Sequence, residues 1–244
     1  MNNQSVAQRL HDQLGKIIAA THPGERLPSE PLLAEQLGVS RATLREAMRT
    51  YETQGIIRRK QGSGTYVNRP PQVLDSGLEV LESIDSMAER SGLSVSFGAL
   101  TVERRPATED EAASLGLPPG EELLNISRVI LAEGHAVAFL VDALPTEMLS
   151  LDQLQAGFKG SILDMLLQRG EPQPVVSMTE INSVPASSKV ARALGIQRGD
   201  VLLNFVADLY DAAGRVVDHS QSYFLPGYFR FHVVRRIAQP TSVA

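Results

Sequence analysis

Apolar residues in the first third of the chain recur with the spacing of a helix that buries one face. Leu32, Leu33 and Leu37 lie on such a face. Ser29 precedes them and suits a helix N-cap, and Gly38 follows them and can adopt the left-handed conformation that ends a helix. We therefore expect a short helix between these two residues.

A second, longer helix is predicted to begin after Ser40. Its inward face would consist of apolar residues three and four positions apart, namely Leu44, Ala47, Met48 and Tyr51. Its outer face would carry Arg41, Ala42, Thr43, Arg45 and Arg49. Arginines on such a helix can pair with guanine edges or phosphates in the major groove of DNA. An amphipathic helix with solvated arginines has the same pattern, so the helix alone leaves both interpretations open.

The next segment predicts a hairpin with cations beside its tip. Residues 56–60 have the pattern of a strand, 61–64 of a turn and 65–67 of the returning strand. Three cations stand just before the turn, and two glycines within it allow close approach to a sugar-phosphate backbone. Together with the preceding helices, this hairpin predicts a winged helix-turn-helix.

Charge is divided unevenly along the chain. The formal net charge is −5, but residues 1–70 carry ten Lys and Arg against six Asp and Glu, which leaves +4 there and −9 in the remainder. This division suits local attraction to phosphates without general adhesion to polyanions. Because there is no cysteine and the five histidines are scattered, we expect neither a disulfide nor a metal site.

The second part of the chain is predicted to be a separate domain. Residues 70–75 contain two prolines and have the composition of a linker, so we expect domains at 1–69 and 76–238. Leu78, Leu81, Ile84 and Met87 have helical spacing, which predicts a helix over residues 73–90 that Gly92 ends.

The second domain contains an internal duplication with an offset of 79 residues. Leu115 corresponds to Leu194 and Asn125 to Asn204, and each copy continues as strand, turn and strand, at 123–131 and 136–144, then at 201–210 and 216–224. Further strands are expected near 94–104, 175–183 and 228–234. The pattern predicts an α+β fold, a mainly antiparallel sheet with helices packed on it. A cleft near the axis relating the two halves would suit a ligand, although duplication also arises where it only builds a core.

Residues 1–70 closely resemble the DNA-binding domain of the GntR family of bacterial transcription regulators. The matching positions are residues 27–30, 33–34, 37–47, Gly55 and 62–67. The resemblance implies DNA contacts by Ser40, Arg41, Thr43, Arg45 and Gly62. Neighbouring polar, cationic and glycine residues complete the predicted DNA-binding set, namely Ser29, Arg49, Arg58, Lys60, Gln61, Ser63, Gly64 and Thr65. Many members carry an arginine where this chain has Pro31, which implies an altered contact.

The second domain resembles the UTRA effector domain of the HutC subfamily, which shares its fold with chorismate lyase. The resemblance is carried by residues 127–130, 133–134, 160–163, 194–196, 211–218 and 223–224. It implies that an effector faces Arg128, Ser161, Asp218 and Phe224. Gly160, Ile130 and Leu140 complete the predicted effector-binding set.

The chemistry expected of this site depends on Arg128 and on the residues around it. Arg128 can offer its guanidinium to a carboxylate or phosphate, and residues 160–161 open a predicted helix over residues 162–169 whose N-terminal amides can bind an anion. The alternatives are an ion pair for Arg128 and a simple helix cap for Ser161. Sugar-phosphate-binding relatives carry an arginine and a glutamate where this chain has Ile130 and Leu140, so a carboxylate with an apolar body is preferred here.

We therefore expect a homodimeric, cytoplasmic transcription regulator that represses from a palindromic operator on double-stranded DNA and responds to a small-molecule effector, a carboxylate or a phosphorylated metabolite. No cofactor, metal or membrane association is expected. Two alternatives remain: a chorismate-lyase-like enzyme fused to a DNA-binding head, and an architectural DNA-binding protein without an effector. No nucleophile motif or phosphate loop supports catalysis, so we expect no enzyme activity.

Overall fold

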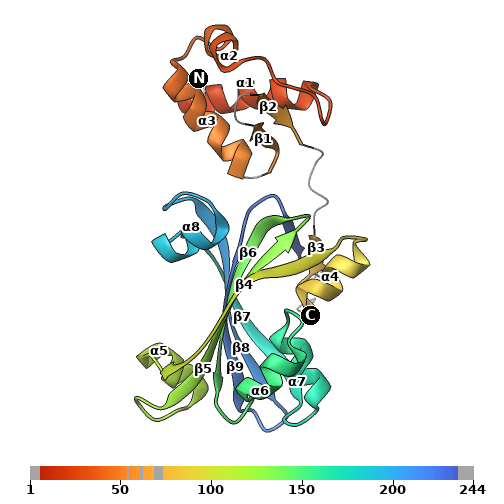
Figure 1. Ribbon diagram of the computed structural model, residues 1–244, viewed down its shortest axis with the longest axis vertical. Helices are drawn as coiled ribbons and strands as arrows, with labels where there is room; N and C mark the ends of the chain where they lie inside the picture. Colours follow the sequence, from red (N-terminus) through yellow and green to blue (C-terminus); the bar gives the residue numbers. More distant parts are fainter. Residues whose placement is uncertain (1–5, 54, 61–62, 69–73, 236–244) are drawn as a thin grey trace, which may run out of the picture. The chain divides into compact units, whose positions relative to one another are not determined.

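A computed structural model describes residues 6–53, 55–60, 63–68 and 74–235 (Figure 1). The chain divides into two compact units, Met1–Val73 with Leu225–Tyr228, and Leu74–Phe224 with Phe229–Ala244. The domain limits 1–69 and 76–238 stay a prediction, and the first strand of the second unit begins at Leu74, inside the segment expected as a linker. Within the described residues, no helix is long and apolar enough to cross a lipid bilayer.

The N-terminal unit consists of three helices followed by a hairpin, which confirms the predicted winged helix-turn-helix. Its elements are α1 (Val6–Ala20), α2 (Glu30–Gln36), α3 (Arg41–Thr53), β1 (Ile57–Lys60) and β2 (Gly64–Val67). Ser29 is the N-cap of α2, and Gly38 has the expected left-handed conformation just after that helix, with φ 65°. At the start of α3, the Thr43 amide donates to Ser40 Oγ at 3.1 Å.

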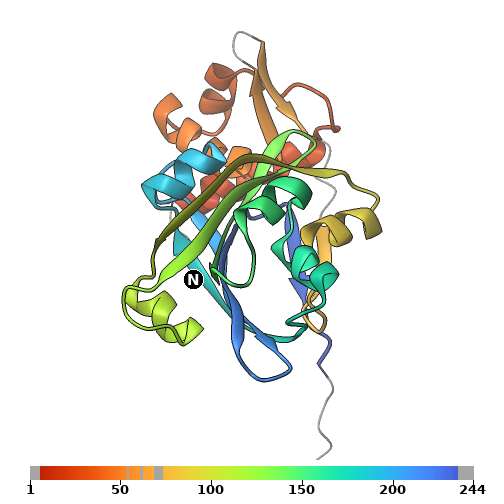
Figure 2. The same ribbon diagram turned by 60° about the horizontal axis from the view of Figure 1, so that its bottom comes forward.

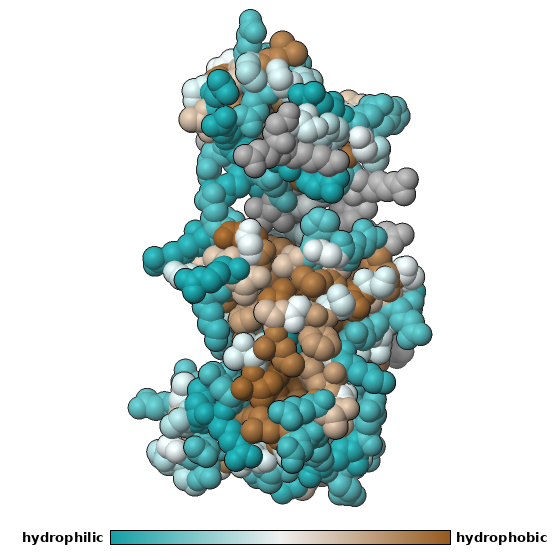
Figure 3. Space-filling view, in the orientation of Figure 1, coloured by the Kyte–Doolittle hydropathy of each residue, from teal (hydrophilic) through white to brown (hydrophobic). Residues whose placement is uncertain are grey.

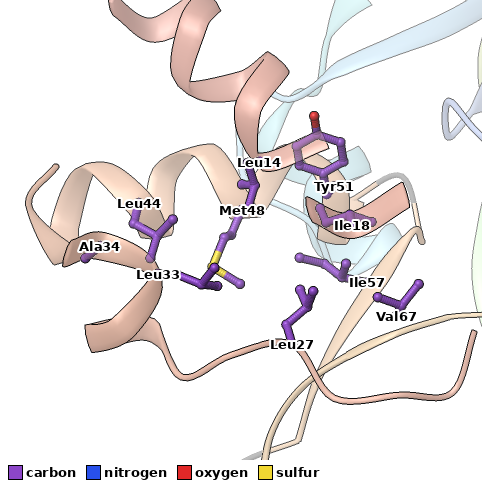
Figure 4. Close-up of a cluster of buried hydrophobic side chains, with 10 residues drawn as sticks. All are labelled: Leu14, Ile18, Leu27, Leu33, Ala34, Leu44, Met48, Tyr51, Ile57 and Val67. Carbon is purple, nitrogen blue, oxygen red and sulfur yellow. The ribbon is translucent and has the colours of Figure 1, made fainter. Parts of the chain in front are cut away.

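One hydrophobic core holds this unit together (Figure 4). It joins α1, α2, α3 and both strands through Leu14, Ile18, Leu27, Leu33, Ala34, Leu44, Met48, Tyr51, Ile57 and Val67. The predicted inward face of α3 is confirmed, since Leu44 and Met48 are fully buried. The predicted apolar face of α2 is wrong at Leu32, which is 54% exposed. Adjacent helical residues point about 100° apart, so a helix that buries Leu33 and Ala34 turns Leu32 outward.

The C-terminal unit is built on a six-stranded antiparallel sheet with the order β4-β5-β6-β9-β8-β7. The strands are β4 (Val95–Pro106), β5 (Glu122–Ala132), β6 (His135–Pro145), β7 (Pro174–Pro185), β8 (Val201–Asp211) and β9 (Val216–Phe224). The predicted duplication is confirmed in the fold: β4 and β7, and likewise β5 and β8, are offset by 79 residues at both ends. The two related halves meet where β6 pairs with β9.

Helices cover both faces of this sheet. They are α4 (Ile84–Arg90), α5 (Glu109–Leu115), α6 (Leu151–Gly157), α7 (Ile162–Arg169) and α8 (Ser188–Leu194). The duplicated helices α5 and α8 lie on one face, and α6 and α7 lie on the other (Figures 1 and 2). Leu115 of α5 packs on Leu123 and Ala143, whereas Leu154 of α6 packs with residues that alternate with these along β5 and β6.

At the ends of this unit, the predicted helix has the wrong bounds, and the predicted strand is confirmed but has a different partner. The helix expected over residues 73–90 is only α4, preceded by the strand β3 (Leu74–Gly77). The strand expected near 228–234 is β10 (Phe229–His232), which pairs in parallel with β3 and not with the large sheet. A partner more than 150 residues away leaves no signal in local periodicity. Ser83 then caps α4 by accepting from the Ser86 amide, which starts the helix late.

Candidate DNA interface and candidate effector site

The arginines on the outward face of α3 differ in their exposure to solvent and in their ion-pair partners. Arg41 is exposed near the start of the helix. Arg45 is also exposed, and its Nε donates to Glu30 Oε2 of α2 at 2.7 Å. Glu30 therefore fixes the direction of Arg45 while more than half of that side chain remains open to solvent. Arg49 is half-buried and its Nη1 lies 3.2 Å from Glu46 Oε1.

Polar residues beside the N-terminus of α3 are open to solvent. Ser40 and Thr43 are both exposed, and their hydroxyl oxygens lie 2.7 Å apart. The first amides of a helix favour an anion such as a phosphate. Ser29 is exposed at the start of α2, where its side chain makes no capping hydrogen bond. Its hydroxyl is therefore not committed to the helix that it precedes.

The hairpin brings further predicted residues next to these helices. Arg58 is exposed, whereas the Nε of Arg59 lies 3.5 Å from Glu52 Oε2 of α3. Ser63 Oγ lies 2.7 Å from the Tyr66 hydroxyl across the turn. Thr65, predicted to contact DNA, is 7% exposed, so its side chain packs inward; strand alternation places it opposite the outward-facing positions. Gln61, Gly62 and the side chain of Lys60 lie outside the described residues.

One cation at the hairpin was missed by the sequence reasoning. A Cβ at Gly64, where φ is +116°, would lie 2.4 Å from Arg26 Nε, so the guanidinium of Arg26 lies directly on the backbone of β2. Arg26 is exposed and forms an isolated bridge with Tyr66. Arg26 lies in a loop, where periodicity gives no signal, and the sequence pattern placed Gly64 in the predicted turn.

The predicted effector-binding residues converge on one face of the six-stranded sheet. Arg128 pairs with Leu140 on β6, and Leu140 pairs with Ser222 on β9. Ile130 belongs to the next row on the same face, which ends at Phe224. All seven predicted residues are buried, although Gly160 and Ser161 lie outside the sheet, just before α7.

Arg128 is engaged in the ion pair that the sequence left as an alternative. Its Nη1 donates to Asp142 Oδ2 on β6, and its Nε donates to the carbonyl oxygen of Gly160. The side chains of Arg128 and Asp142 are 5% and 8% exposed. Sequence reasoning missed Asp142, although a carboxylate in the otherwise apolar strand β6 is the signal that could have identified it.

Two other predicted residues have structural partners. Ser161 Oγ accepts from the Asp164 amide at 3.0 Å, so this residue caps α7, as its alternative interpretation had it. Phe224 lies within an aromatic cluster, with ring centroids 4.7 Å from Phe229 and 5.1 Å from both Phe205 and Phe231. Neither residue presents a free polar group to a ligand.

Asp218 differs from its neighbours because part of its polar group has no partner. It is 6% exposed, and its Oδ1 makes no hydrogen bond within the described part of the chain. Burial, reinforced by the nearby Asp142 carboxylate, raises the pKa of Asp218 well above its ordinary value, against the lowering effect of Arg128. Burial therefore disfavours the charged form of this carboxyl group.

An open cavity of about 540 Å³ lies elsewhere in the C-terminal unit. It is lined by Asp75, Gly77, Glu79, Val80, Glu82, Arg90, Ser91 and His232, none of which belongs to the predicted effector set. Its carboxylates already have partners, for example Arg230 for Asp75 and Arg90 for Glu82. Asp218, in contrast, is buried, and one of its carboxyl oxygens has no hydrogen-bond partner among the described residues.

Comparisons with known proteins match both units. The family described as "Bacterial regulatory proteins, gntR family" matches residues 2–67, and the UTRA domain matches residues 90–230. Among curated proteins, the chain is 28% identical over 218 residues to the HTH-type transcriptional repressor NagR of Bacillus subtilis (strain 168), covering 88% of each chain. It is 24% identical to the mannosyl-D-glycerate transport/metabolism system repressor MngR of Escherichia coli (strain K12), covering 95% of this chain and 94% of that one.

Solved structures show the same fold. PhnF from Mycobacterium smegmatis superposes with a TM-score of 0.63 at 22% identity, over 94% of this chain and 100% of that one. The effector domain of PhnF alone gives a TM-score of 0.59 at 20% identity, over 67% of this chain and 99% of that domain. The resemblance stated from sequence motifs therefore extends to the architecture of both units.

The matches to both units account for the helix-turn-helix with its wing and for the duplicated six-stranded sheet. The family is one of transcription regulators, which agrees with the expectation that the chain is not an enzyme. The chain belongs to the GntR family of bacterial regulatory proteins and is a transcription regulator of the HutC subfamily, with an N-terminal DNA-binding helix-turn-helix and a C-terminal UTRA domain.

Proposed function

We propose that this protein is a homodimeric, cytoplasmic repressor that binds a palindromic operator and is released from it by a small-molecule effector. The observation that carries the proposal is the exposed N-terminal half of α3, which carries Arg41 and Arg45 together with the hydroxyl groups of Ser40 and Thr43. The names of NagR and MngR, both repressors, support the sign of regulation. Two such helices in a symmetric dimer would enter successive major-groove faces, which requires inverted half-sites.

The exposed apolar surface of the UTRA unit supports a dimer. β7 is an edge strand of the sheet, and four of its apolar side chains are about half-exposed, namely Val175, Val176, Met178 and Ile181. Figure 3 shows apolar residues gathered over the strands of this unit. An unprotected apolar edge strand favours association with another chain.

Release by an effector requires only that the effector prefers the state with lower DNA affinity. A preference of about 3 kcal/mol corresponds to roughly 100-fold weaker DNA binding and is within the usual range of coupling energies. The buried polar groups on β5, β6 and β9 are the proposed effector site.

The DNA-binding part is tested with an operator selected by the wild-type protein from random-sequence DNA. Arg41→Ala and Arg45→Ala should each weaken operator binding by about 1–3 kcal/mol, measured by fluorescence anisotropy, because each removes a base or phosphate contact. Arg192→Ala, which removes an exposed arginine from α8, is the matched control and should bind normally. Unchanged operator affinity in both α3 variants, with intact circular dichroism, would rule out this helix as the recognition element.

A further inference from the structure

The proposed effector site contains a buried guanidinium whose charge is already balanced. Arg128 is paired with Asp142 and also donates to the Gly160 carbonyl oxygen. On its other side, its guanidinium carbon lies 5.6 Å from the ring centroid of Phe158. An incoming anion would have to compete with Asp142 for this arginine, which disfavours the carboxylate or phosphate expected from the sequence.

Carboxyl groups outnumber cations around this arginine. Asp142 and Asp218 lie on the sheet, and Asp208 of β8 also acts electrostatically on Asp218. From the helices, Asp85 of α4 and Asp164 of α7 lie close enough to influence each other, and burial together with Asp164 raises the pKa of Asp85. Asp85 also approaches Gly160, since a Cβ there would lie 3.5 Å from Asp85 Oδ2. The region therefore favours a positive charge over a negative one.

Asp218 supplies a second, independent observation. More than nine-tenths of the residue is buried, its carboxyl group points toward Asp142, and its Oδ1 has no hydrogen-bond partner among the described residues. A buried acceptor without a donor is destabilising unless something else supplies the donor. A ligand carrying N–H groups would do so.

We propose that the effector is an organic cation whose protonated nitrogen binds the carboxylate of Asp218. This inference rests on the proposed function, because it names the ligand class for the same site. A ligand cation beside Asp218 lowers the pKa of its carboxyl group, so binding favours the charged form, any proton on it passes to solvent, and an ion pair with the ligand nitrogen forms. The half-buried rings of Phe97 and Phe158, with centroids 5.2 Å apart, provide an aromatic wall beside Gly160 for the rest of the ligand.

A metal ion is a poorer candidate for this positive charge. Among the described residues, no group of three or more His, Asp or Glu side chains is arranged to hold a metal ion. An organic cation needs only one carboxylate and an apolar surface for its body.

The test uses the whole chain and two series of matched probes, each with a cation, an anion and a neutral compound. The first series is phenethylamine, 3-phenylpropionate and 2-phenylethanol, and the second is putrescine, succinate and 1,4-butanediol. A wider panel of amine, carboxylate, phosphate and neutral metabolites is screened beside them. Thermal shift identifies the binders, and isothermal titration calorimetry measures the affinity and the protons released, in two buffers that differ in protonation enthalpy and contain neither a primary amine nor phosphate. We expect binders to be amines, at least 10-fold tighter than the matched anions, with release of up to one proton.

Asp218→Asn keeps the shape of the side chain and removes its charge. We expect it to weaken amine binding at least 10-fold and to abolish proton release, while the protein remains folded. Asp152→Asn, which removes an exposed carboxylate from the first turn of α6, is the matched control, and we expect amine binding to persist. Tighter binding of carboxylates or phosphates, or unchanged amine affinity in Asp218→Asn, would overturn the inference. If no compound of any charge binds, the effector-response proposal itself fails, and this inference fails with it.

Discussion

At the scale of single residues, Glu111 has one of the most strongly held carboxylates of the UTRA unit. Arg105 donates to both of its oxygens, at 2.6 and 2.7 Å, and the Thr108 amide donates to it at 2.9 Å. These bonds, led by those from Arg105, lower the pKa of Glu111 to about 2 from an ordinary 4.5. The pair joins the end of β4 to the start of α5.

Glu111→Gln should therefore destabilise the protein by about 1 kcal/mol at pH 7, because the capping box and a charge-assisted pair are weakened. A lowered folded-state pKa means that this stabilisation is fully present above pH 4.5 and is lost as the pH falls toward 2. The difference between variant and wild type in urea unfolding should accordingly shrink below pH 4.5.

The geometry itself tolerates glutamine, since α6 begins with the same capping box made by Ser150 and Gln153. Glu109→Gln, in the first turn of α5 but outside the box, is the control and should leave stability nearly unchanged. A difference for Glu111→Gln that does not vary with pH would contradict the role assigned to its charge.

At the scale of elements, α1 and α3 of the DNA-binding unit meet through a glycine. The Tyr51 hydroxyl donates to the His11 carbonyl oxygen at 2.8 Å, and the two rings stack with centroids 4.5 Å apart. A Cβ at Gly15 would lie 2.6 Å from that hydroxyl oxygen. Glycine in the middle of α1 is therefore explained by packing, against its poor helix propensity.

Gly15→Ala should destabilise the protein by about 1–2 kcal/mol, although alanine favours helices more than glycine by about 1 kcal/mol. In a Tyr51→Phe background the obstructing oxygen is absent, so the same change should become neutral or stabilising. Thermal unfolding of the four variants of this cycle measures the coupling. Equal effects of Gly15→Ala in both backgrounds would show that the contact with Tyr51 is not the cause.

Elements with their own boundary signals could be predicted from the sequence. The predicted helix Ile162–Arg169 and strand Val216–Phe224 coincide with α7 and β9, because a capping serine, a left-handed glycine and a glycine turn mark their ends. β3 and the pairing of β10 could not be predicted, because each of these strands has its partner about 155 residues away along the chain.

The predicted sites likewise contain some features that the sequence pattern could predict and others that it could not. The exposed arginines of α3 follow from helical periodicity, which also defines the buried face. The pairing of Arg128 with Asp142 required the register of β5 against β6, and the contact between Arg26 and Gly64 required the hairpin itself. Periodicity gives the direction of a side chain, whereas its partner depends on tertiary structure.

At the scale of the whole molecule, the proposed dimer makes β7 a sensitive site. Met178→Lys combined with Val176→Lys should reduce the molecular mass measured by sedimentation to that of a monomer, because two charges would be buried in an apolar interface. Binding to a palindromic operator should weaken accordingly, whereas binding to a single half-site should not.

Val80→Lys provides the matched control, since Val80 is an apolar residue that is 75% exposed outside the sheet. It should leave the molecular mass and operator binding unchanged. A β7 double variant that sediments as a dimer would place the subunit contact on another surface.

The parallel pairing of β3 with β10 also sets an order of events during synthesis. The Arg230–Asp75 pair joins residues 155 positions apart, so the UTRA unit cannot close this contact until translation has passed residue 230. The helix-turn-helix, whose core lies between Leu14 and Val67, can fold while the ribosome is still producing the rest. In the nascent chain, the helix-turn-helix can therefore be folded before the UTRA unit is complete.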